Sequence, residues 1–573
     1  MAESTSSSRP KTSNDLPAVA PGLAIPAIPS IRLGGWSFYF IAKFVLYARE
    51  LIGWHALENL AFAAALLVPL QPAWRRARNV VALPVAAALL YHDSWLPPFS
   101  RLWSQATLLT DFSADYLLEL AGRFVNLEVI ALLVLAWATH RVVAPYLRTG
   151  VLVMAGVAGL ALAPLFQAWM PSGPPAVAAQ SAVQAPNPLK PDDLLREFYA
   201  AEAQRAVRLP DAASTSGQAP FDIVFLHVCS LSWDDLRLVG LDQHPLWSRF
   251  DALFTQFNSA ASYSGPSAIR IQRALCGQTS HHGLYDAAAD HCYLFPNLKR
   301  AGYTPELAMN HDGHFDDFLP VLRRQGLNAP PLPLAGVPIP QRGFDNSPIH
   351  DDLAVLTRWL DARRQTDPAQ TAEGRSALYY NTISLHDGNK LVSGDKLDAV
   401  ASYRLRAGKL FDDINGFLSL LEQSGRLAVV VLVPEHGAAL RGDKFQIAGL
   451  REMPTPSITT VPVGVKIIGA QREGDGVRID APSSYLALSQ LLANVMARPP
   501  FEMAAISDSP ARLRMADYTA QLPVTRYVAD HEGTVVMALP GGGGGSTEGT
   551  EAPGRAAHYL LQRVGQAWQD YEP

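Results

Sequence analysis

The stretch that decides the fold is FDIVFLHVCSLSWDDL, Phe221–Leu236. Its first half, Asp222–Val228, is a short apolar run rich in β-branched and aromatic residues, which predicts a buried strand. The run stops abruptly at Cys229. A buried strand that ends on a thiol raises the question of what that thiol binds.

Apolar runs alternate with helical patterns from this strand to the C-terminal part of the chain. The alternation predicts an α/β domain with a mostly parallel sheet flanked by helices, in which ligands gather beyond the carboxyl ends of the strands. The expected strands are Asp222–Val228, Tyr303–Asn310, Leu378–Leu385, Leu427–Val433 and Val461–Ile468, and the expected helices are Leu246–Phe254, one starting at Pro266, Leu397–Glu422 and Pro482–Ala497.

Three predicted strand or helix ends carry reactive side chains. Cys229 ends the first strand, PEHG (Pro434–Gly437) follows a later one, and Ser264 precedes the proline that is expected to open a helix. A buried cysteine, a solvated Glu-His pair or an SGPS turn is ordinary when taken alone. Together they supply sulfur, oxygen and nitrogen donors that zinc accepts in tetrahedral sites. We therefore predict a zinc site made of Cys229, Ser264, Glu435 and His436.

The cysteine count supports this interpretation. The chain has three cysteines, and two of them are expected to pair in an oxidising compartment. Cys276 and Cys292 flank a short polar stretch, and closing that loop is worth about 3 kcal/mol on a chain-entropy model. Cys229 is then left over, and a bound metal ion would keep it as thiolate and protect it from oxidation.

The first third of the chain has a different character. Five apolar segments predict a polytopic membrane domain. Arginine-rich connections lie between the second and third segments and between the fourth and fifth, and the positive-inside rule places both of them in the cytoplasm. The odd number of spans then puts the rest of the chain in the periplasm of a bacterium. The net charge of −5 argues against a nucleic-acid partner. The segments are Trp36–Leu51, Ala56–Leu70, Asn79–Tyr91, Val125–Val143 and Gly150–Met170.

These observations divide the chain into four parts. We expect a disordered cytoplasmic tail at 1–33, a membrane domain at 34–170, a linker with a bridging helix at 171–220 and a periplasmic catalytic domain at 221–573. Near the C-terminus, GTVVMAL and HYLLQRVGQAWQDY flank a glycine-rich loop. They either pair as a β-hairpin, or the second forms a short helix.

The motifs resemble those of a known family. Ser264-Gly-Pro-Ser267 is similar to the nucleophile motif of the alkaline phosphatase and sulfatase superfamily, and Glu435-His436-Gly437 resembles its metal-binding Asp-His-Gly. Five spans before such a domain resemble the lipid A phosphoethanolamine transferases, which usually have an acidic residue, a threonine and an aspartate where this chain has Cys229, Ser264 and Glu435. That set, with SLHDG (Ser384–Gly388) and Arg451–Val465, instead resembles the bacterial cellulose phosphoethanolamine transferases, over essentially the whole chain.

The resemblance implies an alkaline-phosphatase-like fold and a transfer of phosphoethanolamine from phosphatidylethanolamine, a membrane lipid, to the 6-hydroxyl of glucose units in cellulose. It also implies a multi-pass protein of the bacterial inner membrane and a complex with the membrane cellulose synthase. Covalent catalysis would split the transfer into two displacements, with Ser264 as nucleophile.

Other side chains are assigned by the chemistry of these steps. His386 is the expected general acid and base and His311 the reserve candidate, because one histidine can give and then take a proton. Arg451 is expected to hold a phosphate oxygen, and Tyr263 to contact the phosphate or the ammonium group. Three alternatives remain open: a transferase that acts on lipid A or another periplasmic glycan, a phosphodiesterase that releases phosphoethanolamine to water, and a catalytically silent anchor of the synthase.

Overall fold

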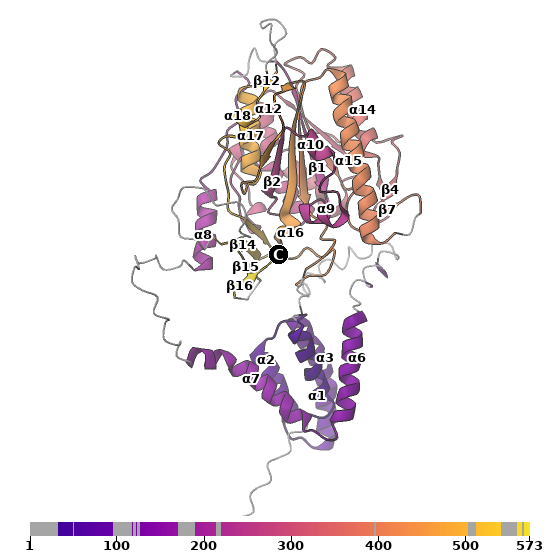
Figure 1. The fold of residues 1–573 in the computed structure, drawn as a ribbon, viewed down its shortest axis with the longest axis vertical. Coiled ribbons are helices and arrows are strands. Elements are labelled where there is room, and N and C mark those ends of the chain that lie inside the picture. The colour runs from indigo at the N-terminus through magenta and orange to yellow at the C-terminus, as the bar shows by residue number, and fades with distance from the viewer. Residues whose placement is uncertain are drawn as a thin grey trace, which may run out of the picture. The chain divides into compact units, whose positions relative to one another are not determined.

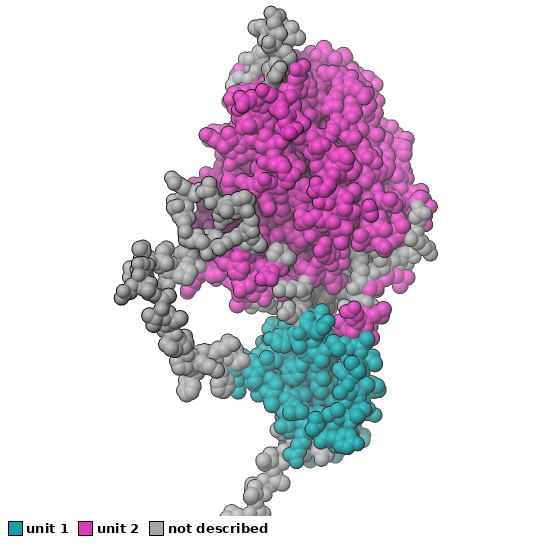
Figure 2. Space-filling view, viewed as in Figure 1, with its two compact units in different colours: residues 1–94, 131–174 teal, residues 95–130, 175–573 magenta. Residues whose placement is uncertain are grey.

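A computed structural model describes most of the 573-residue chain. The described residues are 33–49, 51–94, 117–118, 122, 127–169, 190–213, 219–394, 397–443, 445–501, 512–539, 558–563 and 567–572. They form two compact units, one of residues 1–94 and 131–174 and the other of residues 95–130 and 175–573 (Figure 2). The predicted tail at 1–33 lies almost wholly outside the described residues.

The first unit is helical where the apolar segments predict helices. Its core holds Phe40, Phe62, Ala63 and Val157, all at most 8% exposed. Within the described residues, no helix is both long and apolar enough to cross a membrane. The helices of the N-terminal third are α1 (Trp36–Ala48), α2 (Ala56–Leu67), α3 (Pro72–Asp93), α6 (Leu127–Val143) and α7 (Thr149–Trp169).

Lys43 is a charged residue within the first apolar segment, and the structure buries it. Its ammonium group forms an ion pair with Asp93 and donates a hydrogen bond to Asn59 Oδ1 at 2.6 Å. His55 Nδ1 lies 2.6 Å from the same Asp93 carboxylate. A charge among apolar helices is thus matched by a partner, as a buried charge requires.

The second unit is built on a seven-stranded sheet with the order β11-β2-β9-β8-β1-β6-β3. Strands β8, β1, β6 and β3 are parallel to one another, and β9 runs antiparallel to both β8 and β2. The expected mostly parallel sheet is therefore confirmed. Its strands are β1 (Asp222–Cys229), β2 (Ala252–Asn258), β3 (Thr304–Met309), β6 (Ser376–Thr382), β8 (Ala428–His436), β9 (Thr460–Ile468) and β11 (Val477–Ile479).

Helices cover both faces of this sheet. Alternate residues of β1 point to opposite faces, so that Ile223 and Phe225 belong to one buried cluster and Val224 and Leu226 to another. Figure 1 shows α12 and α17 on one side of the sheet and α14 and α15 on the other. The helices are α9 (Trp233–Val239), α10 (Leu246–Arg249), α11 (Ser264–Gln272), α12 (Leu294–Arg300), α13 (Phe318–Arg324), α14 (Asp352–Thr366), α15 (Ala399–Ser424), α16 (Pro456–Thr459), α17 (Tyr485–Ala497) and α18 (Ala516–Thr519).

The C-terminal segment forms a separate four-stranded antiparallel sheet, β13-β14-β15-β16. Pairing of β14 with β15 confirms the predicted hairpin. The predicted bridging helix is α8 (Pro191–Glu202), and it packs Leu194 and Phe198 against this sheet. The strands of this sheet are β13 (Val528–His531), β14 (Thr534–Ala538), β15 (Tyr559–Gln562) and β16 (Gln569–Tyr571). The described residues also form two small sheets of short strands. One consists of β4 (Gln341–Arg342), β5 (Pro348–Ile349) and β7 (Lys390–Leu391), and the other of β10 (Gln471–Arg472) and β12 (Arg512–Leu513).

The predicted helix Leu246–Phe254 is wrong in its second half. The helix ends at Arg249, and β2 begins at Ala252. Asp251 explains the change, because its backbone N–H donates to Val465 O at 2.8 Å and its carboxylate accepts from Ile467 N at 2.7 Å. These bonds join the chain to β9, and pairing in the sheet overrides the local helical pattern. The helix predicted to start at Pro266 starts at Ser264.

Candidate metal centre and active site

The ends of β1 and β8 bring three of the predicted metal ligands together. The two strands pair in simple register as far as Val228 and Pro434, and the register then shifts so that Cys229 lies opposite His436. Such a shift is a bulge, which re-aims side chains at the end of a strand. One ligand atom from each of Cys229, Glu435 and His436 lies within 4.8 Å of the others, and all three residues are buried.

Ser264 joins this cluster from the first position of α11. Its hydroxyl donates to Cys229 Sγ at 3.4 Å. Three residues along the same helix, the Ser267 hydroxyl donates to the carbonyl oxygen of Glu435 at 3.1 Å, which ties α11 to the end of β8. The four residues predicted to bind metal therefore meet at the carboxyl edge of the sheet.

Burial controls the protonation of the three predicted ligands. It raises the pKa of the Cys229 thiol to about 12, and the nearby Glu435 acts in the same direction. It also raises the pKa of Glu435, against polar contacts with Ser264, Asn381 and Cys229. Burial holds the pKa of His436 well below its usual range, and the positive charge of Arg451 adds to this effect, so that the imidazole is neutral. Neutral imidazole is the form that binds metal.

The site has the properties expected of a metal centre. Within the described residues, Glu435 Oε2 is a buried oxygen with no hydrogen-bond partner. It lies 3.8 Å from His436 Nε2, which in turn is 4.0 Å from Cys229 Sγ. A divalent cation would satisfy the orphaned oxygen and stabilise the thiolate. The donor set fits zinc better than magnesium, because a thiolate is a soft ligand.

Arg451 and Tyr263, the predicted substrate-binding residues, lie beside each other. The Arg451 guanidinium is 5.2 Å from the centre of the Tyr263 ring, and it donates to Ser230 Oγ at 3.3 Å. Within the described residues, its buried Nε has no hydrogen-bond partner. The Tyr263 hydroxyl donates to Glu452 Oε1 at 2.7 Å. Arg451 therefore has a donor left to bind an anion, whereas the tyrosine hydroxyl is already used.

The two histidines considered as acid and base have different surroundings. Burial lowers the pKa of His386 to about 4, and the positive charge of Arg451 acts in the same direction with a smaller effect. The centres of the His386 and Phe344 rings are 5.1 Å apart. His386 Nδ1 lies 2.7 Å from Asp387 O, which leaves Nε2 for another partner. Both ring nitrogens of His311 are engaged, by Asn381 Oδ1 at 2.8 Å and by Gly313 N at 3.1 Å.

Sequence reasoning missed two buried residues that contact the site. Asn381, near the end of β6, donates to Glu435 Oε1 at 2.7 Å. His227 Nδ1 lies 3.5 Å from the same oxygen and 2.7 Å from the Tyr379 hydroxyl. His227 stands two residues before Cys229 and so faces the same side of β1, a period-2 signal that was available in the sequence. Asn381 carried no comparable signal.

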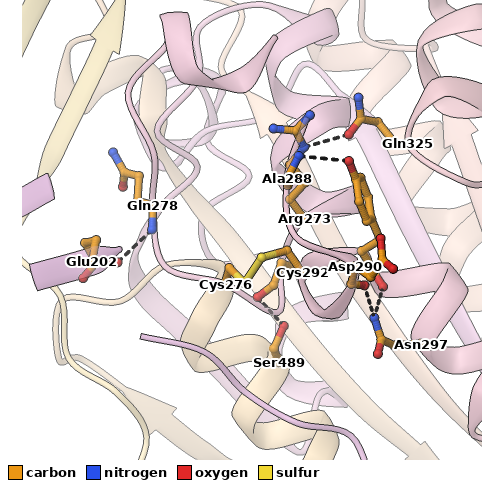
Figure 3. The surroundings of a disulfide bond; sticks show 12 residues. Glu202, Arg273, Cys276, Gln278, Ala288, Asp290, Cys292, Asn297, Gln325 and Ser489 are labelled. Carbon is orange, nitrogen blue, oxygen red and sulfur yellow. Dashed lines mark hydrogen bonds between the residues drawn. A yellow bond between two sulfur atoms is a disulfide. The ribbon is translucent and has the colours of Figure 1, made fainter. Parts of the chain in front are cut away.

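The predicted disulfide between Cys276 and Cys292 is present (Figure 3). Nearby, Glu202 accepts from the backbone N–H of Gln278 at 2.8 Å, which ties the end of α8 to the loop after Cys276. His291 lies close to the two sulfur atoms, but those atoms are bonded to each other. The structure therefore leaves Cys229 as the free thiol.

The comparison with family models and the comparison with curated proteins give the same result. Residues 176–545 match the model of the cellulose biosynthesis protein BcsG C-terminal domain, and residues 36–162 match that of the N-terminal domain. The cellulose biosynthesis protein BcsG of Escherichia coli K12 is 40% identical over 88% of this chain and 93% of its own length. That of Salmonella typhimurium LT2 is 40% identical over 89% and 94%.

Among solved structures, a protein in the alkaline phosphatase superfamily from Vibrio parahaemolyticus is similar with a TM-score of 0.43 and 12% identity, covering 67% of this chain and 92% of its own. The family models together span both units of the chain, and the curated relatives align along almost their full length. On this evidence, the chain belongs to the cellulose biosynthesis protein BcsG family.

Proposed function

We propose that this chain is a zinc-dependent transferase that moves phosphoethanolamine from phosphatidylethanolamine to the 6-hydroxyl of glucose units in cellulose. The observation that carries the proposal is the convergence of Ser264, Cys229, Glu435 and His436 at one edge of the sheet. A hydroxyl among metal-binding side chains suits a nucleophile for phosphoryl transfer. Membership in a cellulose biosynthesis family supports the acceptor.

In this proposal Cys229, Ser264, Glu435 and His436 hold the zinc ion. When bound, zinc lowers the pKa of a coordinated hydroxyl and stabilises charge on phosphoryl oxygens. The chain supplies the remaining parts. The buried guanidinium of Arg451 binds a non-bridging phosphate oxygen, and the two backbone N–H groups at the start of α11, those of Ser264 and Gly265, face the incoming phosphate.

The first displacement forms a bond between Ser264 Oγ and phosphorus and breaks the bond between phosphorus and the glyceryl oxygen of the donor. His386, which is neutral at rest because burial lowers its pKa to about 4, takes the proton from Ser264 Oγ and passes it to the glyceryl oxygen as that oxygen leaves, so that the proton lost by the serine is the one gained by the diacylglycerol. In the second displacement, His386 takes the proton of the glucose 6-hydroxyl as that oxygen attacks phosphorus. Ser264 Oγ then leaves and receives that proton from His386, so that the enzyme returns to its starting state.

The test uses the purified full-length chain, phosphatidylethanolamine and cello-oligosaccharides. We expect modified oligosaccharide with the wild type, and a phosphoethanolamine adduct on Ser264 by mass spectrometry when no acceptor is present. Ser264→Ala should abolish both, whereas Ser248→Ala, which removes an exposed hydroxyl, should change neither. Product on lipid A alone would overturn the acceptor, release to water alone would mean a phosphodiesterase, and equal product with Ser264→Ala would overturn the mechanism.

We further propose that residues 34–170 anchor the catalytic domain, 221–573, to the periplasmic face of the inner membrane, with 171–220 as the connection and 1–33 as a cytoplasmic tail. The family's two domain models support two functional parts. The anchored domain would meet both the lipid donor and the glucan from the cellulose synthase complex. Labelling of single engineered cysteines in whole cells tests this topology: a cysteine at Ala2 should be protected and one at Ser248 accessible.

A further inference from the structure

Asn381 is a fully buried amide whose donor group points at a proposed metal ligand. Its Nδ2 donates to Glu435 Oε1 at 2.7 Å and to the carbonyl oxygen of His227 at 3.1 Å. An amide nitrogen offers two hydrogens, so these two bonds use both of them. Hydrogen bonds to a charged carboxylate are among the stronger ones in a protein. Asn381 therefore fixes the position of one oxygen of Glu435.

Fixing Oε1 determines what the other oxygen can do. Within the described residues, Glu435 Oε2 has no hydrogen-bond partner although it is buried, and it lies 3.8 Å from His436 Nε2. The carboxylate thus presents a single free oxygen to the cluster of Cys229 and His436. This arrangement suits a carboxylate that binds a metal ion through one oxygen.

His311 determines which way the Asn381 amide points. The backbone N–H of Gly313 donates to His311 Nδ1 at 3.1 Å. Because a backbone N–H can only donate, Nδ1 carries no hydrogen and the proton of the neutral ring lies on Nε2. Nε2 then donates to Asn381 Oδ1 at 2.8 Å. The amide oxygen must face His311, and the amide nitrogen must face Glu435.

A directional chain of hydrogen bonds therefore runs from the backbone of Gly313 through His311 and Asn381 to Glu435. We propose that His311 and Asn381 are positioning residues, which orient Glu435 so that its free oxygen binds the metal ion. The inference rests on the metal site of the proposed function and adds residues from β6 and from the loop after β3. It gives His311 a role other than acid or base, because both of its ring nitrogens are used.

The experiment measures zinc affinity by chelator competition with the purified full-length chain. Asn381→Leu and His311→Leu should each weaken zinc binding by about 10- to 100-fold, the range for residues that support metal ligands. His311→Gln should retain most of the affinity, because the glutamine amide can place a donor where Nε2 stands. The matched control is Asn494→Leu, since Asn494 also donates one amide bond and accepts another, on α17 away from the site.

A spectroscopic measurement separates orientation from general destabilisation. Cobalt in place of zinc gives a thiolate charge-transfer band from Cys229, and Asn381→Leu should alter the visible ligand-field bands that report the carboxylate. The Asn494→Leu variant should leave these bands unchanged. Wild-type affinity and an unaltered cobalt spectrum in both leucine variants would overturn this inference alone. A wild-type chain that binds no zinc would overturn the metal site and this inference together.

Discussion

Gly437, the third residue of the Glu-His-Gly motif, is predicted to tolerate no side chain. Its backbone is not in the left-handed region that favours glycine, so space must be the reason. A Cβ built on Gly437 would lie 2.5 Å from Ser232 Oγ, 2.7 Å from Ser232 Cβ and 2.7 Å from Asp235 Oδ2. All three distances are shorter than real Cβ contacts, and Ser232 Cβ cannot rotate away. Gly437→Ala must therefore displace either the start of α9 or the loop after His436.

Both of those segments are held firmly. Ser232 caps α9 by accepting from Asp235 N at 3.2 Å, and Asp235 accepts from Ala438 N at 2.6 Å and from Leu440 N at 3.0 Å. Overpacking a well-packed site costs about 1–3 kcal/mol. We expect Gly437→Ala to lower the free energy of unfolding of the second unit by this amount, and to weaken zinc binding because His436 is the preceding residue.

Gly408 provides a matched control for the same chemical change. It lies within α15, and a Cβ there would meet nothing within 4 Å. Gly408→Ala should raise stability by about 0.5–1 kcal/mol, because alanine is the better helix former. Urea denaturation of the full-length chain, followed by tryptophan fluorescence and interpreted from midpoints and slopes together, should show stabilities of the two variants that differ by about 1.5–4 kcal/mol. Equal stability of Gly437→Ala and wild type would refute the steric argument.

Three other predictions test separate features of the molecule. Cys229→Ser should weaken zinc binding by at least about tenfold in chelator competition, and a variant with wild-type affinity would remove the thiol from the metal site. Replacing both Cys276 and Cys292 by serine should lower the unfolding free energy by about 3 kcal/mol, from the 16-residue separation that the disulfide closes; an unchanged urea midpoint would contradict this. Asp222→Ala should lower the free energy of unfolding by about 3–5 kcal/mol, because the buried Asp222 carboxylate pairs with Arg426 at 2.7 Å and with Arg363 at 3.4 Å. Asp361→Ala removes an exposed carboxylate that pairs with Arg364, and it should leave the free energy of unfolding nearly unchanged.

The sequence predicts best those elements whose pattern is set by burial. Asp222–Val228 and Leu427–Val433 are continuous apolar runs, and the structure places both in the centre of the sheet, as β1 and β8. The predicted helix Leu246–Phe254 overlaps the first residues of β2, 252–254, because the strand conformation there depends on bonds between Asp251 and β9, which are distant in sequence. Local patterns cannot report such long-range pairing.

The residues of the candidate site also fall into those that the sequence could predict and those that it could not. Cys229, Ser264, Glu435 and His436 could be predicted because each is a reactive side chain at the end of an apolar run or the start of a helix. Asn381 could not, because a buried asparagine in a strand has no feature that distinguishes a structural amide from one that holds a metal ligand. Its role follows only from the partners at its two ends, His311 and Glu435.

The register shift between β1 and β8 is the feature that connects fold and proposed chemistry. If the register continued unchanged beyond the pair of Val228 and Pro434, Cys229 would lie opposite Glu435 and Ser230 would lie opposite His436. The shift instead sets Cys229 against His436 and leaves Glu435 unpaired in the ladder. Freed from that pairing, the Glu435 carboxylate can be held by Asn381 on one oxygen while the other faces the thiol and the imidazole. A single extra residue in β8 thus brings Cys229, Glu435 and His436 together as the proposed ligands, and Ser264 of α11 completes the proposed set.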